Sequence, residues 1–268
     1  VLKGLSSQNK FLPSKYFYDG RGDELFREIM NLPEYYLTNC EYEILERQSP
    51  EIVKKFDMNG QAFDLIEFGP GDASKTKLMI STLLEMGIDF KYVPIDISPN
   101  VIEMIKEDFL KNFPSVKLDP RNDDFFRALE DINLSENIRK VVLFMGSNIG
   151  NFKKEDAVDF LKEISSRMHS QDNLLIGLDL KKNPELILNA YNDRRGVTAE
   201  FNYNLLRRIN RELGADFAVE NFMHYPVYSP ETGEARSYLV SKTEHTVTIE
   251  ALDKTFYFSE WEHIFMEV

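Results

Sequence analysis

The loop from Glu67 to Gly71 ends a short apolar run and holds two glycines, Gly69 and Gly71, where the chain must turn sharply. Such a turn lets a ligand approach the backbone, and the first N–H groups of the following helix are free to bind polar atoms of that ligand. Ser74 stands where the dinucleotide-binding pattern has its third glycine, which counts against NAD and FAD. The loop predicts a nucleotide-like ligand. The alternative is that the turn only packs a helix against a strand.

Two acidic residues follow the next expected strands. Asp96 ends a second apolar run, where a carboxylate can accept hydrogen bonds from both hydroxyls of an adenosine ribose. Asp124 follows the expected third strand, where an acid can accept from an adenine amino group while Phe125 covers the ring. Taken singly, Asp96 is equally a helix cap before Ser98, and Asp124 is a polar turn. In this order behind the glycine turn, the two acids favour an adenosine-containing ligand.

These residues belong to a stretch that alternates short apolar runs with longer amphipathic segments, as repeated βα units around a parallel sheet do. We expect short buried strands at residues 63–68, 90–95, 140–145 and 174–180. We expect crossover helices at residues 75–85, 101–112 and 155–168. The sequence therefore predicts an α/β fold with a doubly wound, Rossmann-like core.

The flanks have a different pattern. Near the N-terminus, a helical stretch at 24–31 separates two aromatic clusters. Three later stretches alternate polar and apolar side chains and predict an antiparallel meander, namely 236–242, 245–250 and 255–258. The predicted organisation is a core at residues 46–181 and a second α+β lobe, for the substrate, built from residues 1–45 and 182–268.

The composition narrows the classes of partner. The 268 residues are 43% hydrophobic and 29% charged, which predicts a packed core. A formal net charge of -13 repels phosphate backbones, so we expect a small-molecule substrate and no nucleic acid. One cysteine, Cys40, excludes an internal disulfide, and four separated histidines lack metal-ligand spacing, so we expect no metal. No apolar run approaches the roughly 20 residues of a membrane span, and we expect a cytoplasmic protein. The oligomeric state stays open, with a monomer favoured.

Five segments, spread over nearly the whole chain, have the order and spacing of motifs from one enzyme family. They are Lys15–Asp19, Leu32–Thr38, Phe144–Phe152, Gly196–Asn202 and Asn210–Phe217. Together they resemble the histidine-specific Nα-methyltransferases of ergothioneine biosynthesis. The resemblance implies a class I methyltransferase core, S-adenosylmethionine as the methyl donor, and up to three methylations of the α-amino group of histidine, which give hercynine.

The resemblance also implies roles for individual residues. Tyr35 is expected at the substrate side chain, Asn151 and Tyr191 at the substrate carboxylate, and Glu267 at the imidazole. The residues expected near the amine and the methyl donor are Tyr18 and Gly146. Tyr18 and Asn151 are therefore the candidates for a catalytic role. On the donor side the matching positions are Gly69, Lys75, Asp96, Asp124 and Phe125, to which the glycine loop itself adds Glu67 and Gly71.

Each of these residues has a plainer alternative. Tyr18 and Tyr35 are suited to packing between lobes, and Tyr191 to a core. Asn151 is suited to capping the helix that follows it. Glu267 lies in an alternating segment, and alternation alone would turn its side chain to solvent.

Two departures from the family bear on the substrate. Where many histidine-specific members have a methionine in the strand lining the pocket, this chain has Ser237, a smaller and more polar wall that could admit another side chain. The sequence stops at Val268, whereas the family continues with a serine at the imidazole, a helix and two strands of the core sheet, so we expect the C-terminal end of the core to be absent. We predict N-methylation of L-histidine. The alternatives are a tryptophan-like or other biogenic amine, or a catalytically silent cofactor-binding module.

Overall fold

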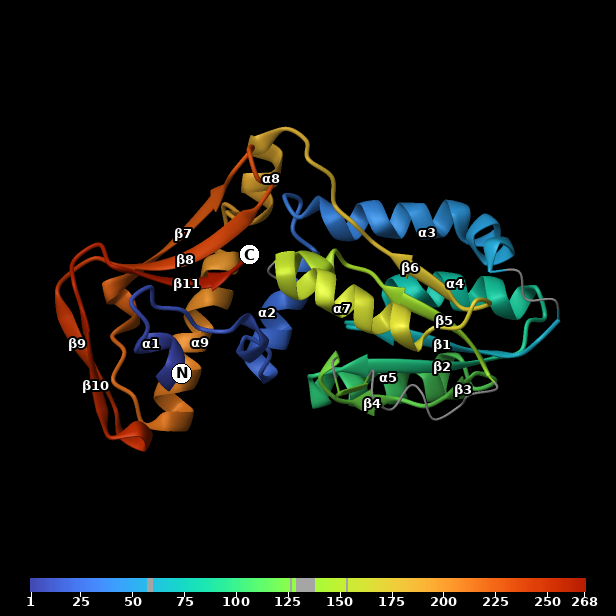
Figure 1. Ribbon diagram of the computed structural model, residues 1–268, viewed down its shortest axis with the longest axis horizontal. Helices are drawn as coiled ribbons and strands as arrows, with labels where there is room; N and C mark the ends of the chain where they lie inside the picture. Colours follow the sequence, from blue (N-terminus) through green and yellow to red (C-terminus); the bar gives the residue numbers. More distant parts are fainter. Residues whose placement is uncertain (57–59, 126, 129–137, 153) are drawn as a thin grey trace. The chain divides into compact units, whose positions relative to one another are not determined.

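The computed structural model describes residues 1–56, 60–125, 127–128, 138–152 and 154–268. It contains two compact units (Figure 1). The flank unit comprises Val1–Tyr36 and Leu180–Val268, and the core unit comprises Leu37–Asp179. This division differs from the predicted boundaries at 45/46 and 181/182, because helix α3 (Tyr36–Lys55) runs through residue 45. Among the described residues, no helix has both the length and the apolar composition that a bilayer crossing needs.

The core unit is built on a parallel sheet whose strand order is β3-β2-β1-β5-β6, with β4 also pairing with β2. The strands are β1 (Phe63–Phe68), β2 (Phe90–Asp96), β3 (Lys117–Leu118), β4 (Arg121–Asn122), β5 (Arg139–Phe144) and β6 (Asn173–Ile176). The chain starts at β1, fills one edge, then crosses back to place β5 on the other side of β1. This reversal brings the carboxyl ends of β1 and β5 together, which is where ligands bind in open α/β sheets.

Helices cover both faces of this sheet. Helix α3, α4 (Ser74–Glu85) and α5 (Pro99–Asn112) pack on the face that presents Phe63 and Leu65 of β1. Helix α7 (Lys154–Arg167) packs on the opposite face, against Ile66 and Phe68. Alternate residues of β1 thus enter two separate hydrophobic cores. The predicted doubly wound α/β core is confirmed.

The flank unit combines helices with two small antiparallel sheets, shown in red and orange in Figure 1. Its helices are α1 (Leu2–Leu5), η1 (Ser14–Tyr16), α2 (Gly20–Met30), α8 (Pro184–Ala190), α9 (Val197–Leu213), η3 (Val219–Asn221) and η4 (Glu250–Leu252). Its strands are β7 (Phe222–Tyr228), β8 (Ala235–Ser241), β9 (His245–Ile249), β10 (Lys254–Phe258) and β11 (His263–Glu267). Helix α9 buries one side, including Phe201 and Leu205, and packs against α2 and β7.

The predicted meander is wrong in its pairing. β9 pairs with β10 in a two-stranded sheet, whereas β8 lies between β11 and β7 in a separate three-stranded sheet. The sequence prediction missed β7 because Pro226 lies inside it, and proline normally argues against a strand. β7 is an edge strand, and there the N–H that proline lacks can face away from the sheet. The strand expected at 174–180 is also shorter, because β6 ends at Ile176 and the later Leu178 is 63% exposed.

Candidate functional site

The glycine loop of the core unit adopts a run of left-handed backbone conformations. Gly69 has φ +67°, Gly71 has φ +58°, and Ala73, the N-cap of α4, has φ +54°. A side chain at Gly69 would place its Cβ 2.7 Å from Asn148 Nδ2 and 3.3 Å from Phe125 Cζ, so only glycine fits there without a shift. At Gly71 the same position is open, with no atom of the described, non-neighbouring residues within 4 Å. The loop therefore offers backbone that a ligand can approach closely.

Glu67 lies just before this loop with its carboxyl group enclosed. It accepts hydrogen bonds from Thr76 Oγ1, at 2.6 Å, and from the Tyr92 hydroxyl. Burial raises the pKa of Glu67, and the two hydrogen bonds oppose that rise. Since its two oxygens accept hydrogen bonds from α4 and β2, the Glu67 carboxyl group holds the start of the loop in place.

The two predicted acids lie on neighbouring parts of the sheet edge. Asp96 ends β2, and its Oδ1 accepts the Ser98 N–H at 2.9 Å, while Ser98 itself caps α5. Asp124 follows β4, which pairs with β2. Phe125 packs edge-on against Phe68, with ring centroids 5.5 Å apart, so one side of its ring is held by the core. Carboxylates for ribose hydroxyls and for an amino group, with an adjacent aromatic ring, fit the adenosine part of S-adenosylmethionine.

Lys75 and Gly146 are brought together at the carboxyl ends of β1 and β5 by a residue that the sequence analysis did not select. The Glu41 carboxylate of α3 accepts the Gly146 N–H at 2.8 Å and 2.9 Å, one distance to each oxygen. It also forms an ion pair with Lys75 Nζ. A cation at this position suits the carboxylate of the donor's methionine part. No pattern around Glu41 marks it, because it is one acid on an ordinary helix.

Asn151 ends the short helix η2 (Asn148–Asn151), three residues beyond the loop that contains Gly146. It is exposed, whereas Asn148 of the same helix lies beside both Gly69 and Gly146. Asn148 is thus a second residue of the donor side that the sequence analysis did not single out, although the quoted segment Phe144–Phe152 contains it.

The remaining predicted residues lie in the flank unit. Tyr35 and Tyr191 meet edge to face, with ring centroids 6.2 Å apart. Tyr18 packs against Phe26 and Phe201 at 5.8 Å each. Tyr35 therefore lies beside Tyr191, and Tyr18 lies beside two phenylalanines of its own unit. The roles of these tyrosines at the substrate stay predictions.

Glu267 faces inward because of a β-bulge. Ile264 pairs with Leu239 and Phe265 with Tyr238, so a regular ladder would pair Met266 with Ser237. An extra residue shifts the register, and Glu267 is the partner of Ser237 instead. The Glu267 side chain hydrogen bonds with Ser237 and with Asn202 of α9. The solvent-facing alternative for Glu267 is therefore wrong, since simple alternation cannot include a bulge.

The surroundings of Glu267 are buried and polar. Burial raises the pKa of Glu267 to about 7, and the hydrogen bonds from Asn202 and Ser237 oppose this rise. His224 Nε2 lies 3.3 Å from Ser237 Oγ, and burial lowers the pKa of His224 to about 4, which keeps its ring neutral. Asn202 Oδ1 is buried without a hydrogen-bond partner among the described residues. Asn202 and His224 are functional candidates that only the tertiary structure reveals.

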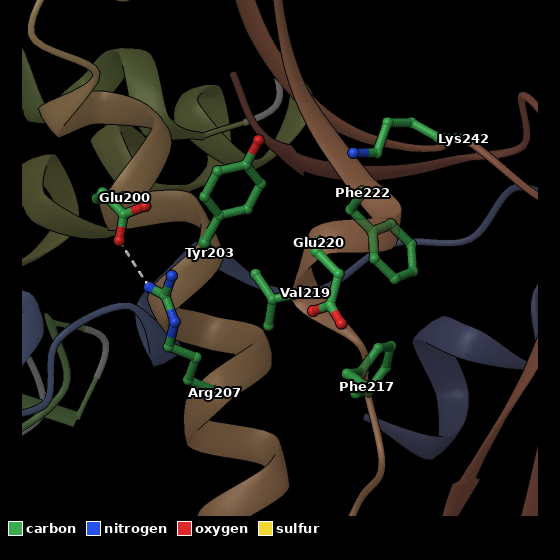
Figure 2. Close-up of a pocket in the computed structure, with 8 residues that line it drawn as sticks. All are labelled: Glu200, Tyr203, Arg207, Phe217, Val219, Glu220, Phe222 and Lys242. Atoms are coloured by element: carbon green, nitrogen blue, oxygen red, sulfur yellow. Dashed lines mark hydrogen bonds and ion pairs between the residues drawn. The ribbon is translucent and has the colours of Figure 1, made fainter.

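The flank unit also has a cavity of about 560 Å³ (Figure 2), and the hydroxyl of its lining residue Tyr203 accepts the His224 backbone N–H at 2.8 Å. Figure 2 shows an Arg207–Glu200 ion pair on α9, at 2.8 Å, on one wall of it. The lining residues are Glu200, Tyr203, Arg207, Phe217, Val219, Glu220, Phe222 and Lys242. None of the predicted site residues is among them.

The comparisons with known proteins agree on one family. Residues 1–268 match the family described as histidine-specific methyltransferases, S-adenosylmethionine-dependent. The histidine N-alpha-methyltransferase of Mycobacterium tuberculosis is 35% identical over 268 residues, which is 100% of this chain and 82% of that protein. The enzyme of the same name from Mycolicibacterium smegmatis is 33% identical with the same coverage. Ergothioneine biosynthesis protein 1 of Schizosaccharomyces pombe is 34% identical over 88% of this chain and 31% of that protein.

Proposed function

The chain belongs to the family of histidine-specific, S-adenosylmethionine-dependent methyltransferases, and from this premise we propose that it methylates the α-amino nitrogen of free L-histidine, up to hercynine. The observation that carries the choice of acceptor is the inward-facing Glu267, whose carboxyl group is held by Asn202 and Ser237. An ionised carboxylate in this position accepts the N–H of an imidazole ring. Its mycobacterial relatives are named for the same reaction.

On the acceptor side, the reaction depends on positioning. Bound S-adenosylmethionine supplies a methyl group on a sulfonium, and in-line transfer requires a neutral amine with a short, aligned approach. In our proposal, Glu267 fixes the imidazole, while the Tyr191 hydroxyl and the Asn151 amide donate to the substrate carboxylate. The ring of Tyr18, proposed near the amine, stabilises the cationic methylated product, and Tyr35 contacts the substrate side chain. No side chain has to form a covalent bond with the substrate.

On the donor side, the core unit supplies the binding groups. Gly69 and Gly71 give close access to the backbone, and Glu67 keeps this loop anchored to β2 and α4. We propose that Asp96 accepts hydrogen bonds from the ribose hydroxyls and that Lys75 binds the carboxylate of the methionine part. We propose that Asp124 accepts a hydrogen bond from the adenine amino group and that the ring of Phe125 covers the adenine.

The test is a mass-spectrometric assay with S-adenosylmethionine and each standard amino acid. We expect histidine to gain one to three methyl groups and the other amino acids to remain unchanged. Two analogues locate the contacts. Nα-acetylhistidine lacks a reactive amine and should not be methylated. Ring N-methylated histidines lack an imidazole N–H, so they should be poor methyl acceptors if Glu267 binds that N–H. Methylation of another amino acid in place of histidine would refute the proposed substrate.

A tryptophan-like amine is the second candidate acceptor, because Ser237 leaves a smaller wall than methionine would. The Ser237 hydroxyl is committed to Glu267 and lies near His224, so the extra space is lined by polar groups. This lining suits imidazole better than an indole, which has one N–H and a larger apolar area. Adding tryptophan and tryptamine to the same assay separates the two candidates.

A further inference from the structure

Glu41 of α3 has a more elaborate environment than a helix acid needs. Its carboxylate receives the Gly146 N–H with both oxygens and pairs with Lys75 Nζ. The side chains of Lys75 and Glu41 are nonetheless 15% and 18% exposed, so the pair is sheltered but reachable.

Two glycines make room for this carboxylate. A Cβ at Gly177, directly after β6, would lie 2.0 Å from Glu41 Oε1 and 3.2 Å from Met145 Cα. The Met145 contact is with backbone, so a side chain at Gly177 would have to displace the Glu41 carboxylate or the strand end. Gly146, at φ +72°, presents its N–H to the same carboxylate and would place a Cβ 3.6 Å from Lys75 Nζ. The backbone at the ends of β5 and β6 is thus shaped around Glu41.

The charges of this pair match one part of the methyl donor. The adenosine part is matched by Asp96, Asp124 and Phe125 at the ends of β2 and β4. The methionine part carries an ammonium and a carboxylate, so it needs an anion and a cation side by side. Lys75 and Glu41 are such a pair, beside the close-packed Gly69 and Asn148.

We propose that Glu41 is the acceptor for the ammonium group of the donor's methionine part, with Lys75 binding its carboxylate. Without ligand the two side chains neutralise each other. With ligand, one internal ion pair is replaced by two pairs to the zwitterion, so no charge is left uncompensated. The Gly146 N–H keeps Glu41 oriented in both states. The proposal concerns the donor alone, so failure of the histidine assay leaves it intact.

The test is a binding comparison by calorimetry with three ligands and no acceptor. S-adenosylhomocysteine has the whole methionine-like part, its deamino analogue lacks only the ammonium, and 5′-methylthioadenosine lacks both charged groups. In the unmodified protein, removal of the ammonium should weaken binding about 10- to 100-fold, as the loss of a charge-assisted hydrogen bond does. In Glu41→Gln, S-adenosylhomocysteine should weaken by a similar factor, and its advantage over the deamino analogue should largely disappear.

Binding of 5′-methylthioadenosine by Glu41→Gln should stay within about twofold, which also reports that the core unit is folded. The matched control is Glu43→Gln on the same helix, where Glu43 forms an exposed pair with Arg47 and should change nothing. Equal weakening of all three ligands by Glu41→Gln would make Glu41 a structural residue and overturn the proposal. Unchanged or tighter binding of S-adenosylhomocysteine would also overturn it, because it would mean that Glu41 only competes for Lys75.

A second variant displaces the Glu41 carboxylate without removing its charge. Gly177→Ala should push the Glu41 carboxylate aside and produce the same selective loss, with S-adenosylhomocysteine weakened and 5′-methylthioadenosine retained. Retention of the full preference for the ammonium in Gly177→Ala would contradict the proposed geometry.

Discussion

The two units position their proposed ligand-binding groups by different structural means. In the core unit the donor groups are mostly backbone and strand ends, placed by one topological reversal between β1 and β5. In the flank unit the groups proposed for the imidazole are side chains from α9, β7, β8 and β11, and a single bulged residue orients Glu267. The difference teaches that a parallel sheet supplies a site through its connectivity, whereas a small antiparallel sheet depends on its local register. The comparison yields five predictions, from the largest expected effect to the smallest.

Gly69→Ala tests whether the donor side depends on close backbone approach. The new Cβ meets Asn148 and Phe125 and imposes a left-handed conformation on alanine, so donor affinity should fall on the order of 100-fold. Calorimetry with S-adenosylhomocysteine measures it. Gly87→Ala is the matched control, because Gly87 also has φ +67° but no described, non-neighbouring residue lies within 4 Å of the new Cβ. Equal donor affinity in the two variants would show that crowding at Gly69 does not affect donor binding.

Glu267→Gln tests the acceptor side. Replacing the carboxylate by a neutral amide removes a charge-assisted acceptor for the imidazole, so the KM for histidine should rise about 30-fold near pH 8. Donor affinity should stay unchanged, since the change lies in the other unit. A comparable loss of donor affinity would mean that Glu267 supports the fold and does not act on the imidazole alone.

The pH profile tests the raised pKa of Glu267. With a pKa of about 7, the carboxylate is mostly ionised at pH 8 and about one tenth ionised at pH 6. Histidine affinity should therefore fall about tenfold from pH 8 to pH 6, relative to the profile of Glu267→Gln. Dividing by that profile removes the titration of histidine itself. A ratio that does not change with pH would place the pKa of Glu267 near its ordinary value.

Ser237→Ala tests one of the hydrogen bonds to Glu267. Losing one neutral donor should raise the KM for histidine about three- to fivefold and move the pH midpoint upward, because the ionised carboxylate is less well stabilised. Ser241→Ala is the control. Ser241 is buried on the same strand, but its hydroxyl donates to the Thr243 carbonyl oxygen. A larger effect from Ser241 would point to sheet stability as the cause.

Arg207→Ala tests whether the cavity of Figure 2 takes part in the reaction. The Arg207–Glu200 pair is about half exposed, so its loss should change stability by less than about 1 kcal/mol. Steady-state kinetics should give a kcat/KM for histidine within about twofold of the unmodified protein. A tenfold loss of kcat/KM would indicate that histidine binds in this cavity and not at Glu267.

The amino-acid sequence alone determined the core fold and the cofactor. The glycine turn and Asp96 are local signals, because each stands at the end of an apolar run and a parallel sheet brings such ends to one edge. Asp124 follows a polar stretch and is predicted from its place in the order. The doubly wound core followed from the same periodicity. The family motifs extended this reading to the acceptor residues Tyr35, Tyr191 and Glu267.

Only the tertiary structure decided how several of these residues are used. Glu67 is in a ligand-like motif, yet its carboxyl group is buried between Thr76 and Tyr92. Glu41 joins Lys75 and Gly146 from more than 30 residues away in sequence, and Glu267 faces inward through a bulge that alternation cannot predict. The physical reason is common to all three. Strand ends and turns are encoded by neighbouring residues, whereas the partner of a charged side chain depends on which distant elements pack beside it.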